Sequence, residues 1–346
     1  MQSNKVRLLH LIKTLDIGGI EKSTILYSNI LVNKLESINI FAKKGFYDNS
    51  GIINDEIKRF YPRHNIWEKR FFIQNLMQLI AVIKNNEITH IHYHHRIFIP
   101  FIFFIKLYFP KIRIIYTHHS CFNDFMNNFV LADKIIALNE ATKNDLPKRL
   151  LQKTIIIPHG VKINNKIKNQ DNPRNIGFVG RFVEEKGILN LIQAFKGINE
   201  EIPDTKLILV GEGPLKNKMI KIIEKLGLID KVVFQKTTRS EDEIFSNIDI
   251  LVLPAEKLEG FGLVILEAMA RGIPVIVSKL NIFKEIIIDK FNGIISDSAS
   301  LKTDILSLIK NKPQINYICK NASKTVYKDY NIENTIRSYL QNAYYA

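Results

Sequence analysis

The chain alternates short, nearly continuous runs of Ile, Val and Leu with longer stretches in which apolar residues recur every three or four positions. The short runs predict strands that helices cover on both faces, and the longer stretches predict those helices. In the first half the predicted strands span residues 6–11, 38–42, 88–93, 113–117, 134–138 and 154–157. The predicted helices there span residues 21–35, 72–84 and 100–108. Such alternation is typical of a parallel, doubly wound sheet.

The same alternation starts again after an aperiodic stretch, residues 162–174, that is rich in Asn and Lys. Predicted strands follow at residues 175–180, 206–211, 232–235, 250–254 and 274–278. Predicted helices follow at residues 188–198, 214–226, 241–246, 262–271, 301–310 and 331–342. We therefore predict two doubly wound α/β domains, residues 1–165 and 175–325, joined by a linker at residues 166–174. Ligands of such sheets bind outside the carboxyl ends of the strands, so we expect a cleft where the two domains face each other.

Composition excludes several classes of protein. Hydrophobic residues make up 46% of the 346 residues and charged residues 24%, which suits a packed globular core. Two cysteines cannot form a disulfide framework, and the first ten residues do not resemble a signal peptide. The longest apolar stretch, residues 97–109, is broken by Pro100 and Lys106 and is shorter than the about 20 residues that cross a bilayer. We expect a cytoplasmic protein.

Positive charge is concentrated in the first half. Residues 1–165 carry 23 basic and 12 acidic residues, whereas residues 166–346 carry 26 and 22, and the whole chain is +15. A basic surface attracts nucleic acids, anionic lipid headgroups or phosphorylated ligands, and the charge alone does not choose among them.

Two segments of the second half carry candidate chemistry. Glu259 and Glu267 flank a glycine-rich turn that opens an apolar helix, where free N–H groups can bind a phosphate and carboxylates can accept from sugar hydroxyls. An ordinary strand-to-helix turn explains the same pattern equally well. Arg181 and Lys186 follow the predicted strand at residues 175–180, where two cations can neutralise a diphosphate, although lone surface cations are common.

Together these segments resemble the retaining glycosyltransferases of glycosyltransferase family 4. The spacing of Glu259 and Glu267 is similar to the donor-site motif of that family, and VGRFVEEKG at residues 179–187 looks like its diphosphate clamp. LVGEGPLK at 209–216 and LPA at 253–255 also match. In the first half, Gly18-Gly19 before Glu21-Lys22 resembles the first loop of the family, and THHS at 117–120 its histidine segment. Departures are His159 for Asn in PHGV, Asn139 for Ser, and Lys236 for Gly.

The resemblance implies a GT-B fold, two Rossmann-like domains across a cleft, with a C-terminal helix (326–346) packing back on the N-terminal domain. It implies that Glu259 and His119 are catalytic, with His119 hydrogen-bonding the donor sugar. Residues expected to bind the donor diphosphate are Gly18, Gly19, Arg181, Lys186, Gly262 and Leu263. Residues expected to bind the sugar and ribose are Glu259, Phe261 and Glu267, with Lys236, Thr237 and Thr238 near the base.

We expect no metal and no cofactor. No Asp-x-Asp is present to hold a metal against the diphosphate, and the family chemistry is metal-independent. His90, His92 and His94 alternate on one predicted strand and raise the possibility of a zinc site, which usually needs three or four convergent ligands. Two doubly wound domains also suit a dinucleotide, but no G-x-G-x-x-G follows the first strand.

The hypothesis is therefore a retaining hexosyl- or N-acetylhexosaminyltransferase that moves a sugar from a nucleoside-diphosphate donor to a glycan or lipid-linked acceptor. We assign it to bacterial lipopolysaccharide, O-antigen or capsule assembly. Cations and aromatic rings at residues 58–72 suggest peripheral attachment to an anionic membrane surface, on the inner face of the cytoplasmic membrane, and a solvated loop is the alternative. A sugar-nucleotide epimerase and a basic nucleic-acid-binding protein are competing functions; no nucleic-acid-reading motif stands out, so we expect no nucleic-acid partner.

Overall fold

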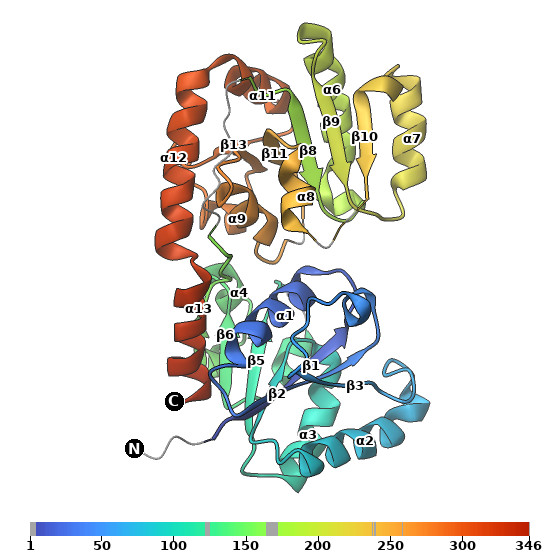
Figure 1. Cartoon of the computed structure of the whole chain (residues 1–346), viewed down its shortest axis with the longest axis vertical. Helices are drawn as coiled ribbons and strands as arrows, with labels where there is room; N and C mark the ends of the chain where they lie inside the picture. Colours follow the sequence, from blue (N-terminus) through green and yellow to red (C-terminus); the bar gives the residue numbers. More distant parts are fainter. Residues whose placement is uncertain are drawn as a thin grey trace. The chain divides into compact units, whose positions relative to one another are not determined.

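A computed structural model describes residues 5–121, 125–163, 172–236, 238, 240–257 and 259–345. The chain divides into two compact units, each a parallel α/β domain (Figure 1). Unit 1 comprises Met1–His159 and Glu333–Ala346, and unit 2 comprises Gly160–Ile332. Most of the predicted linker, at residues 166–171, lies outside the described residues.

Unit 1 is built on a seven-stranded parallel sheet with the order β3-β2-β1-β4-β5-β6-β7. Its strands are β1 (Arg7–Thr14), β2 (Ser37–Lys43), β3 (Lys58–Phe60), β4 (His90–Tyr93), β5 (Arg113–His118), β6 (Lys134–Ala137) and β7 (Thr154–Ile156). Its helices are α1 (Gly19–Leu31), α2 (Phe72–Asn85), α3 (Ile99–Tyr108), α4 (Glu140–Asn144), α5 (Lys148–Leu151), α13 (Ile332–Tyr339) and the π-helical turn η7 (Leu340–Tyr344). Short 3-10 turns are η1 (Phe46–Asn49), η2 (Lys69–Phe71), η3 (Arg96–Phe98) and η4 (Phe125–Phe129).

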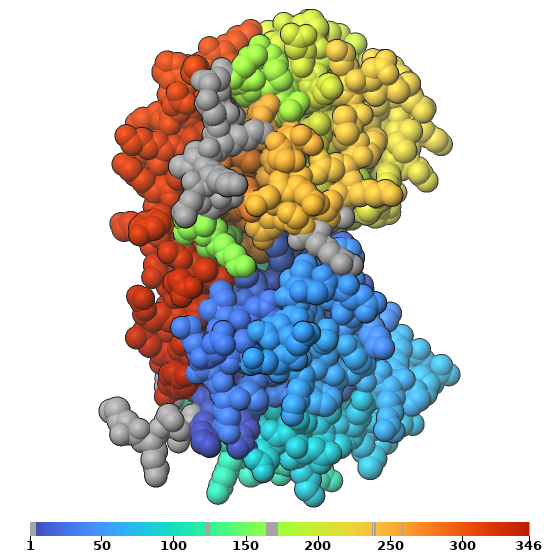
Figure 2. Space-filling model, in the orientation of Figure 1, coloured from blue at the N-terminus to red at the C-terminus, as the bar shows by residue number. Residues whose placement is uncertain are grey.

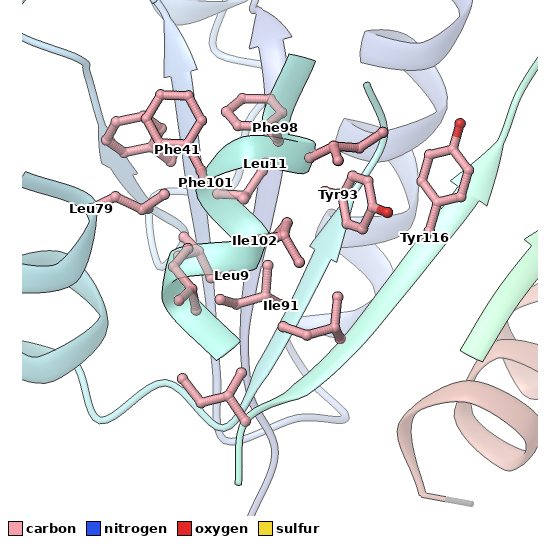
Figure 3. Close-up of a cluster of buried hydrophobic side chains, with 14 of the residues drawn as sticks. Leu9, Leu11, Phe41, Leu79, Ile91, Tyr93, Phe98, Phe101, Ile102 and Tyr116 are labelled. Carbon is pink, nitrogen blue, oxygen red and sulfur yellow. The ribbon is translucent and has the colours of Figure 1, made fainter. Parts of the chain in front are cut away.

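The core of unit 1 lies between this sheet and helices α2 and α3 (Figure 3). Strand residues such as Leu9, Phe41 and Ile91 are fully buried there, and Leu79 of α2 and Ile102 of α3 close over them. Most strand positions are apolar on both faces because helices cover both, although His10 of β1 and His92 of β4 are buried strand residues as well.

Unit 2 is built on a six-stranded parallel sheet with the order β10-β9-β8-β11-β12-β13. Its strands are β8 (Asn175–Val179), β9 (Lys206–Val210), β10 (Val232–Gln235), β11 (Ile250–Leu253), β12 (Val275–Ser278) and β13 (Ile294–Ser296). Its helices are α6 (Ile188–Glu201), α7 (Lys216–Lys225), α8 (Glu241–Ser246), α9 (Leu263–Met269), α10 (Asn281–Lys284), α11 (Leu301–Lys310) and α12 (Lys312–Asp329), with 3-10 turns η5 (Glu184–Lys186) and η6 (Ile229–Lys231).

Local chemistry explains where several helices begin. Pro100 occupies the first turn of α3, where its missing N–H costs no hydrogen bond. The Ser240 hydroxyl accepts from the backbone N–H of Glu243 at 3.3 Å and caps α8, whose first turn is acidic as predicted. Asn311 caps α12 by accepting from the Gln314 N–H at 3.1 Å.

The predicted strands and helices are present, with ends that shift by a few residues, and two doubly wound sheets are confirmed. The sequence reading missed the short strands β3 and β13 and the helices α4, α5, α10 and α12. None of the helices among the described residues combines the length and the apolar character needed to cross a bilayer.

Candidate functional site

The carboxyl edge of the unit 2 sheet brings together two of the predicted site residues. Lys186 lies in η5 after β8, and Glu259 lies between β11 and α9, and β8 and β11 are neighbours in the sheet. The Lys186 ammonium forms an ion pair with the Glu259 carboxylate, and both side chains are mostly buried. The third charged candidate, Arg181, is exposed and has no recorded ion pair within the described ranges. In the described part of this edge, Arg181 is thus a cation without an ion pair and Lys186 is a cation paired with a carboxylate.

The turn that precedes α9 needs glycine. Gly262 is the N-cap of α9 with φ of 84°, and a Cβ there would press on Ile265 and Phe283. Leu263 is the first residue of the helix, so its backbone N–H is one of those that lack a helical acceptor. The predicted phosphate-binding turn thus has the expected local geometry, although α9 is only seven residues long.

The other predicted donor contacts in unit 2 are less open. Phe261 is 5% exposed and its ring meets that of Tyr330 edge to face at 6.2 Å. Glu267 lies on α9 and is also buried, while the Arg271 guanidinium donates to its backbone carbonyl at 2.9 Å. Only a small fraction of each side chain is exposed.

The residues expected near the base are described in part. Lys236 is exposed after β10, and the Thr238 hydroxyl donates to the Ser240 carbonyl at 3.0 Å. Thr237 lies outside the described residues. A cavity of about 350 Å³ lies at the carboxyl ends of β11, β12 and β13 and is lined by Pro254 and Ala255 of the LPA segment, among other residues.

The carboxyl edge of the unit 1 sheet carries a chain of three histidines. His10 of β1 and His92 of β4 are partners in the parallel register, and His94 follows two residues later. His10 Nδ1 lies 3.0 Å from His94 Nε2, and His94 Nδ1 lies 3.0 Å from Nε2 of His119. All three rings are buried, and desolvation lowers the pKa of His10 to about 3 and the pKa values of His94 and His119 well below 6.5. The three rings are therefore neutral at pH 7.

Neutral imidazoles in such a chain must all donate in one direction, because each carries a single N–H. The two ends of the chain, His10 Nε2 and His119 Nδ1, are buried and have no hydrogen-bond partner among the described residues. One of these nitrogens is consequently a free donor and the other a free acceptor. A group that bonds to one end fixes the tautomer of all three rings.

Two further buried histidines sit beside the chain, and both bond to hydroxyl groups. His92 Nδ1 lies 2.8 Å from the Tyr344 hydroxyl, and its Nε2 lies 2.7 Å from the Thr117 hydroxyl. His159 Nδ1 lies 2.8 Å from the hydroxyl of Tyr27, and the His159 ring stacks near His119 with centroids 5.6 Å apart. His159, the departure from the family pattern, is thus part of the same cluster.

A metal ion could use part of this cluster. His10, His92 and His94 each offer a ring nitrogen, and these atoms lie within 4.8 Å of one another. Hydrogen bonds occupy both nitrogens of His92 and of His94, which leaves His10 Nε2 as the one nitrogen of the three rings without a partner. His90, which the sequence pattern groups with His92 and His94 as a candidate zinc site, is not part of this group, and its Nδ1 lies 2.8 Å from the Thr89 hydroxyl.

The glycine loop of unit 1 encloses a carboxyl group. Gly18 is the N-cap of α1 and Gly19 its first residue, and a Cβ on Gly18 would collide with the Glu21 carboxylate. Glu21 is 7% exposed, and burial raises the pKa of its carboxyl to about 7. His95 Nε2 lies 3.7 Å from Glu21 Oε1. A carboxyl that titrates near neutral pH at a strand edge is a candidate acid or base.

His118 and His119 have different environments, although they are adjacent. The His118 ring at the end of β5 bonds to the Asp145 carboxylate at 2.8 Å, away from the histidine chain. His119 is the one that joins His94, so the structure places His119, not His118, in the cluster at the sheet edge.

Sequence reasoning missed His10, Tyr27 and the link through His94. These residues come from β1, α1 and the residue that follows β4, and their contacts depend on strand order and register, which the sequence pattern does not state. A usable signal for Glu21 was present, because an acid two residues after Gly-Gly at a strand edge enters the first turn of a helix.

Two family models match the chain. The model described as Glycosyl transferases group 1 matches residues 161–325, and the model described as Glycosyltransferase Family 4 matches residues 18–165. Each covers somewhat less than half of the chain, and the two meet near the boundary between unit 1 and unit 2.

Curated relatives match over part of their length. An uncharacterized glycosyltransferase of Methanocaldococcus jannaschii is 36% identical over 188 residues, which cover 52% of this chain and 51% of that protein. N-acetyl-alpha-D-glucosaminyl L-malate synthase of Bacillus anthracis is 29% identical over 48% of this chain and 44% of that protein. The chain thus spans about half the length of these curated relatives.

Solved structures match over nearly the whole chain. The crystal structure of HepE from Anabaena in complex with UDP and glucose superposes with a TM-score of 0.83 at 18% identity, and covers 97% of this chain and 98% of that one. This likeness confirms the predicted GT-B class of fold, two Rossmann-like domains with parallel sheets.

Proposed function

We propose that this chain is a retaining enzyme that transfers a sugar from a nucleoside diphosphate. Both halves of the chain match glycosyltransferase family models and the fold is GT-B, which supports glycosyltransferase activity. The acceptor is a hydroxyl group of a glycan or a lipid-linked glycan. The observation that carries the proposal is the pairing of Lys186 with Glu259 beside the exposed Arg181 at the carboxyl edge of β8 and β11.

The ion pair of Lys186 and Glu259 can exchange its carboxylate for a diphosphate. A diphosphate that enters the edge meets Arg181 first, since that guanidinium is exposed and has no recorded ion pair in the described part of the chain. The diphosphate then competes with Glu259 for the Lys186 ammonium, and the carboxylate it releases can accept from sugar hydroxyls. Glu259 thus pairs with Lys186 before the donor binds and contacts the donor sugar afterwards.

The chemical step breaks the bond between the anomeric carbon and the diphosphate, on which negative charge accumulates. Arg181, Lys186 and the N–H groups of Gly262 and Leu263 stabilise that charge, and one such contact is typically worth about 3–4 kcal/mol. The acceptor hydroxyl attacks from the face that the diphosphate leaves, its proton passes to the departing phosphate oxygen, and configuration is retained. Glu259 supports the positive charge at the anomeric carbon, Phe261 and Glu267 contact the sugar and ribose, and no metal or cofactor takes part.

In unit 1 the backbone of Gly18 and Gly19 approaches the diphosphate, and His119 hydrogen-bonds the donor sugar. Because the His119 ring is neutral and its Nδ1 has no partner in the described residues, it can donate to or accept from a sugar hydroxyl according to its tautomer.

HepE was solved with UDP and with UDP-glucose, so we propose a uridine diphosphate donor whose base lies near Lys236, Thr237 and Thr238. The transferred group is a hexose or an N-acetylhexosamine, and the pathway is lipopolysaccharide, O-antigen or capsule assembly. The enzyme works at the inner face of the cytoplasmic membrane, where a lipid-linked acceptor is available.

The test is a screen of UDP-glucose, UDP-N-acetylglucosamine and GDP-mannose by donor hydrolysis and by thermal shift. One donor should raise the melting temperature, and Arg181→Ala should lower turnover about 100- to 1,000-fold. The control Lys225→Ala, an exposed cation of α7, should leave turnover unchanged. Isomerisation of the free sugar nucleotide without an acceptor would favour an epimerase, and binding of no nucleotide would contradict both functions.

A further inference from the structure

Helix α3 is apolar on its outer side as well as on its inner side. Its inner residues Ile99, Phe101, Ile102 and Ile105 are buried in the core of unit 1. Its outer residues Phe103, Phe104, Leu107 and Tyr108 follow the spacing of one helical stripe and are exposed, Leu107 to 66% and Tyr108 to 68%. A surface helix ordinarily places charged or polar residues on this stripe, so an apolar outer stripe has to be explained.

Helix α2 continues this apolar surface. The ring of Phe72, the first residue of α2, contacts Phe101 and Phe104 of α3, with centroids 4.6 Å and 5.7 Å apart, so the start of α2 packs against α3. On α2 the exposed Ile73 and Met77 are one turn apart, at 67% and 66% exposed. We define the α2–α3 face by these outer side chains: Ile73, Met77, Phe103, Phe104, Leu107 and Tyr108. The segments that carry it reach the surface of unit 1 in the space-filling view, in cyan and teal (Figure 2).

The charge around the α2–α3 face is mostly positive, although Arg70 is paired with the preceding Glu68 at 2.7 Å. From Lys69 to Cys121 the sequence contains seven basic residues and a single acidic one, Glu87. Lys69 and Arg70 stand immediately before α2, Lys84 lies in its last turn, and Lys111 follows α3, and all four are exposed. In an anionic bilayer, apolar side chains can insert among the acyl chains while the cations that border them contact the headgroups.

We propose that the α2–α3 face is a membrane-docking surface that inserts its aromatic and aliphatic side chains between the headgroups of an anionic bilayer. A second copy of the chain fits less well, because two such faces would bring their cations together. The residues first considered for docking, 58–72, contribute mainly through Phe72, Lys69 and Arg70. The Tyr61 hydroxyl donates to Asp48 at 2.6 Å, and Trp67 lies under the Lys13 ammonium at 4.2 Å.

The structure offers matched controls for this surface. Ile73 and Ile288 are similarly exposed, at 67% and 62%, and so are Tyr108 and Tyr327, at 68% and 65%, but Ile288 and Tyr327 belong to unit 2. None of these four side chains is buried, so a charged substitution at any of them should leave the fold intact.

The experiment is co-sedimentation of the full chain with phosphatidylcholine vesicles, with and without added phosphatidylglycerol. We expect binding that requires the anionic lipid and weakens in high salt. Ile73→Glu and Tyr108→Glu should each weaken it about tenfold or more, since each removes a buried apolar side chain from the complex. Ile288→Glu and Tyr327→Glu should bind like the unmodified protein.

Equal binding by the two sets of variants would overturn the proposal, and so would no binding to anionic vesicles. Light scattering in solution tests whether a second copy of the chain covers the α2–α3 face. A dimer that Ile73→Glu dissociates would show that it does and would overturn the proposal. Hydrolysis of a soluble donor should be unchanged in Ile73→Glu. The result of the vesicle assay therefore does not depend on whether the proposed donor chemistry is correct.

Discussion

The carboxyl edges of the two parallel sheets differ in whether their side chains are charged or neutral. In unit 2 the edge carries charged side chains, with Lys186 paired to Glu259 and Arg181 exposed. In unit 1 the edge carries buried rings that burial keeps neutral, together with the enclosed Glu21 carboxyl. The same fold thus supports ionic recognition at one edge and a low-dielectric, hydrogen-bonding surface at the other.

Histidine usage makes the difference measurable. All nine histidines lie between residues 10 and 159, so unit 2 contains none. Burial lowers the pKa of seven of them, to about 3 for His10 and His159 and to about 4 for His90 and His95. Burial lowers the pKa values of the other three, His92, His94 and His119, well below 6.5.

The largest expected effect is selective acid unfolding of unit 1. A histidine whose folded pKa lies below its unfolded value of 6.5 binds more protons when unfolded, so stability is lost as pH falls from about 6.5 toward 4. Each such ring contributes about 1.4 kcal/mol per pH unit in that range, and several together approach the stability of a whole domain. Hydrogen exchange with peptide resolution at pH 7.5 and 5.5 should show unit 1 opening first. Protection lost first in unit 2 would contradict the comparison.

The next effect concerns the ion pair of unit 2. Lys186→Met and Glu259→Gln should each lower kcat/KM about 100- to 1,000-fold, because each removes a charge that the proposed transition state uses. The double variant should lose little more than either single one, since the two side chains interact directly. Steady-state transfer assays measure all three. Lys196→Met, which breaks the exposed pair of Lys196 with Glu200 on α6, should change turnover by less than twofold. Full additivity of the two site variants would argue against a shared role.

These two predictions also show what the sequence could provide. The strands were predictable because buried parallel strands are continuous apolar runs, as in β11, which is buried throughout and was predicted at residues 250–254. The position of Arg181, Lys186 and Glu259 at one sheet edge was predictable because these residues lie in short motifs at strand ends.

Helix α12 and the histidine chain were not predictable in the same way. In α12 the buried residues Ile315, Ile318, Cys319, Ala322 and Val326 do keep a helical spacing, but tyrosine, asparagine and lysine between them dilute it. The histidine chain needs β1 beside β4 in a register that pairs His10 with His92, and strand order is a property of the folded sheet.

A smaller effect is expected at Glu21. Its carboxyl has a pKa of about 7 in the fold against 4.5 unfolded, so the native state holds the extra proton between these values. Stability therefore declines as pH rises from 4.5 to 7, opposite in sign to the histidines. Glu21→Gln mimics the protonated form and should raise the free energy of unfolding by about 1–3 kcal/mol at pH 8, with no gain at pH 4.5. Chemical denaturation at the two pH values measures this, and Glu140→Gln, at an exposed site, should be neutral at both. A gain that does not depend on pH would show that burial of charge is not its cause.

The smallest effect tests whether the neutral edge of unit 1 acts as a connected unit. His94→Asn removes both hydrogen bonds of the chain, and one neutral hydrogen bond is worth about 1 kcal/mol, or roughly fivefold in rate. Lost packing alone could produce the same loss of rate, so the decisive measurement is the nitrogen chemical shifts of His10 and His119.

In the unmodified protein both rings should stay neutral to pH 5 in one tautomer each, and the addition of a donor that bonds to His119 should move the shifts of His10. In His94→Asn the His10 shifts should no longer respond, because the relay between the two ends is broken, whereas the control His64→Asn should leave that response intact. A response of His10 that survives His94→Asn would mean that the three rings are neighbours without being coupled.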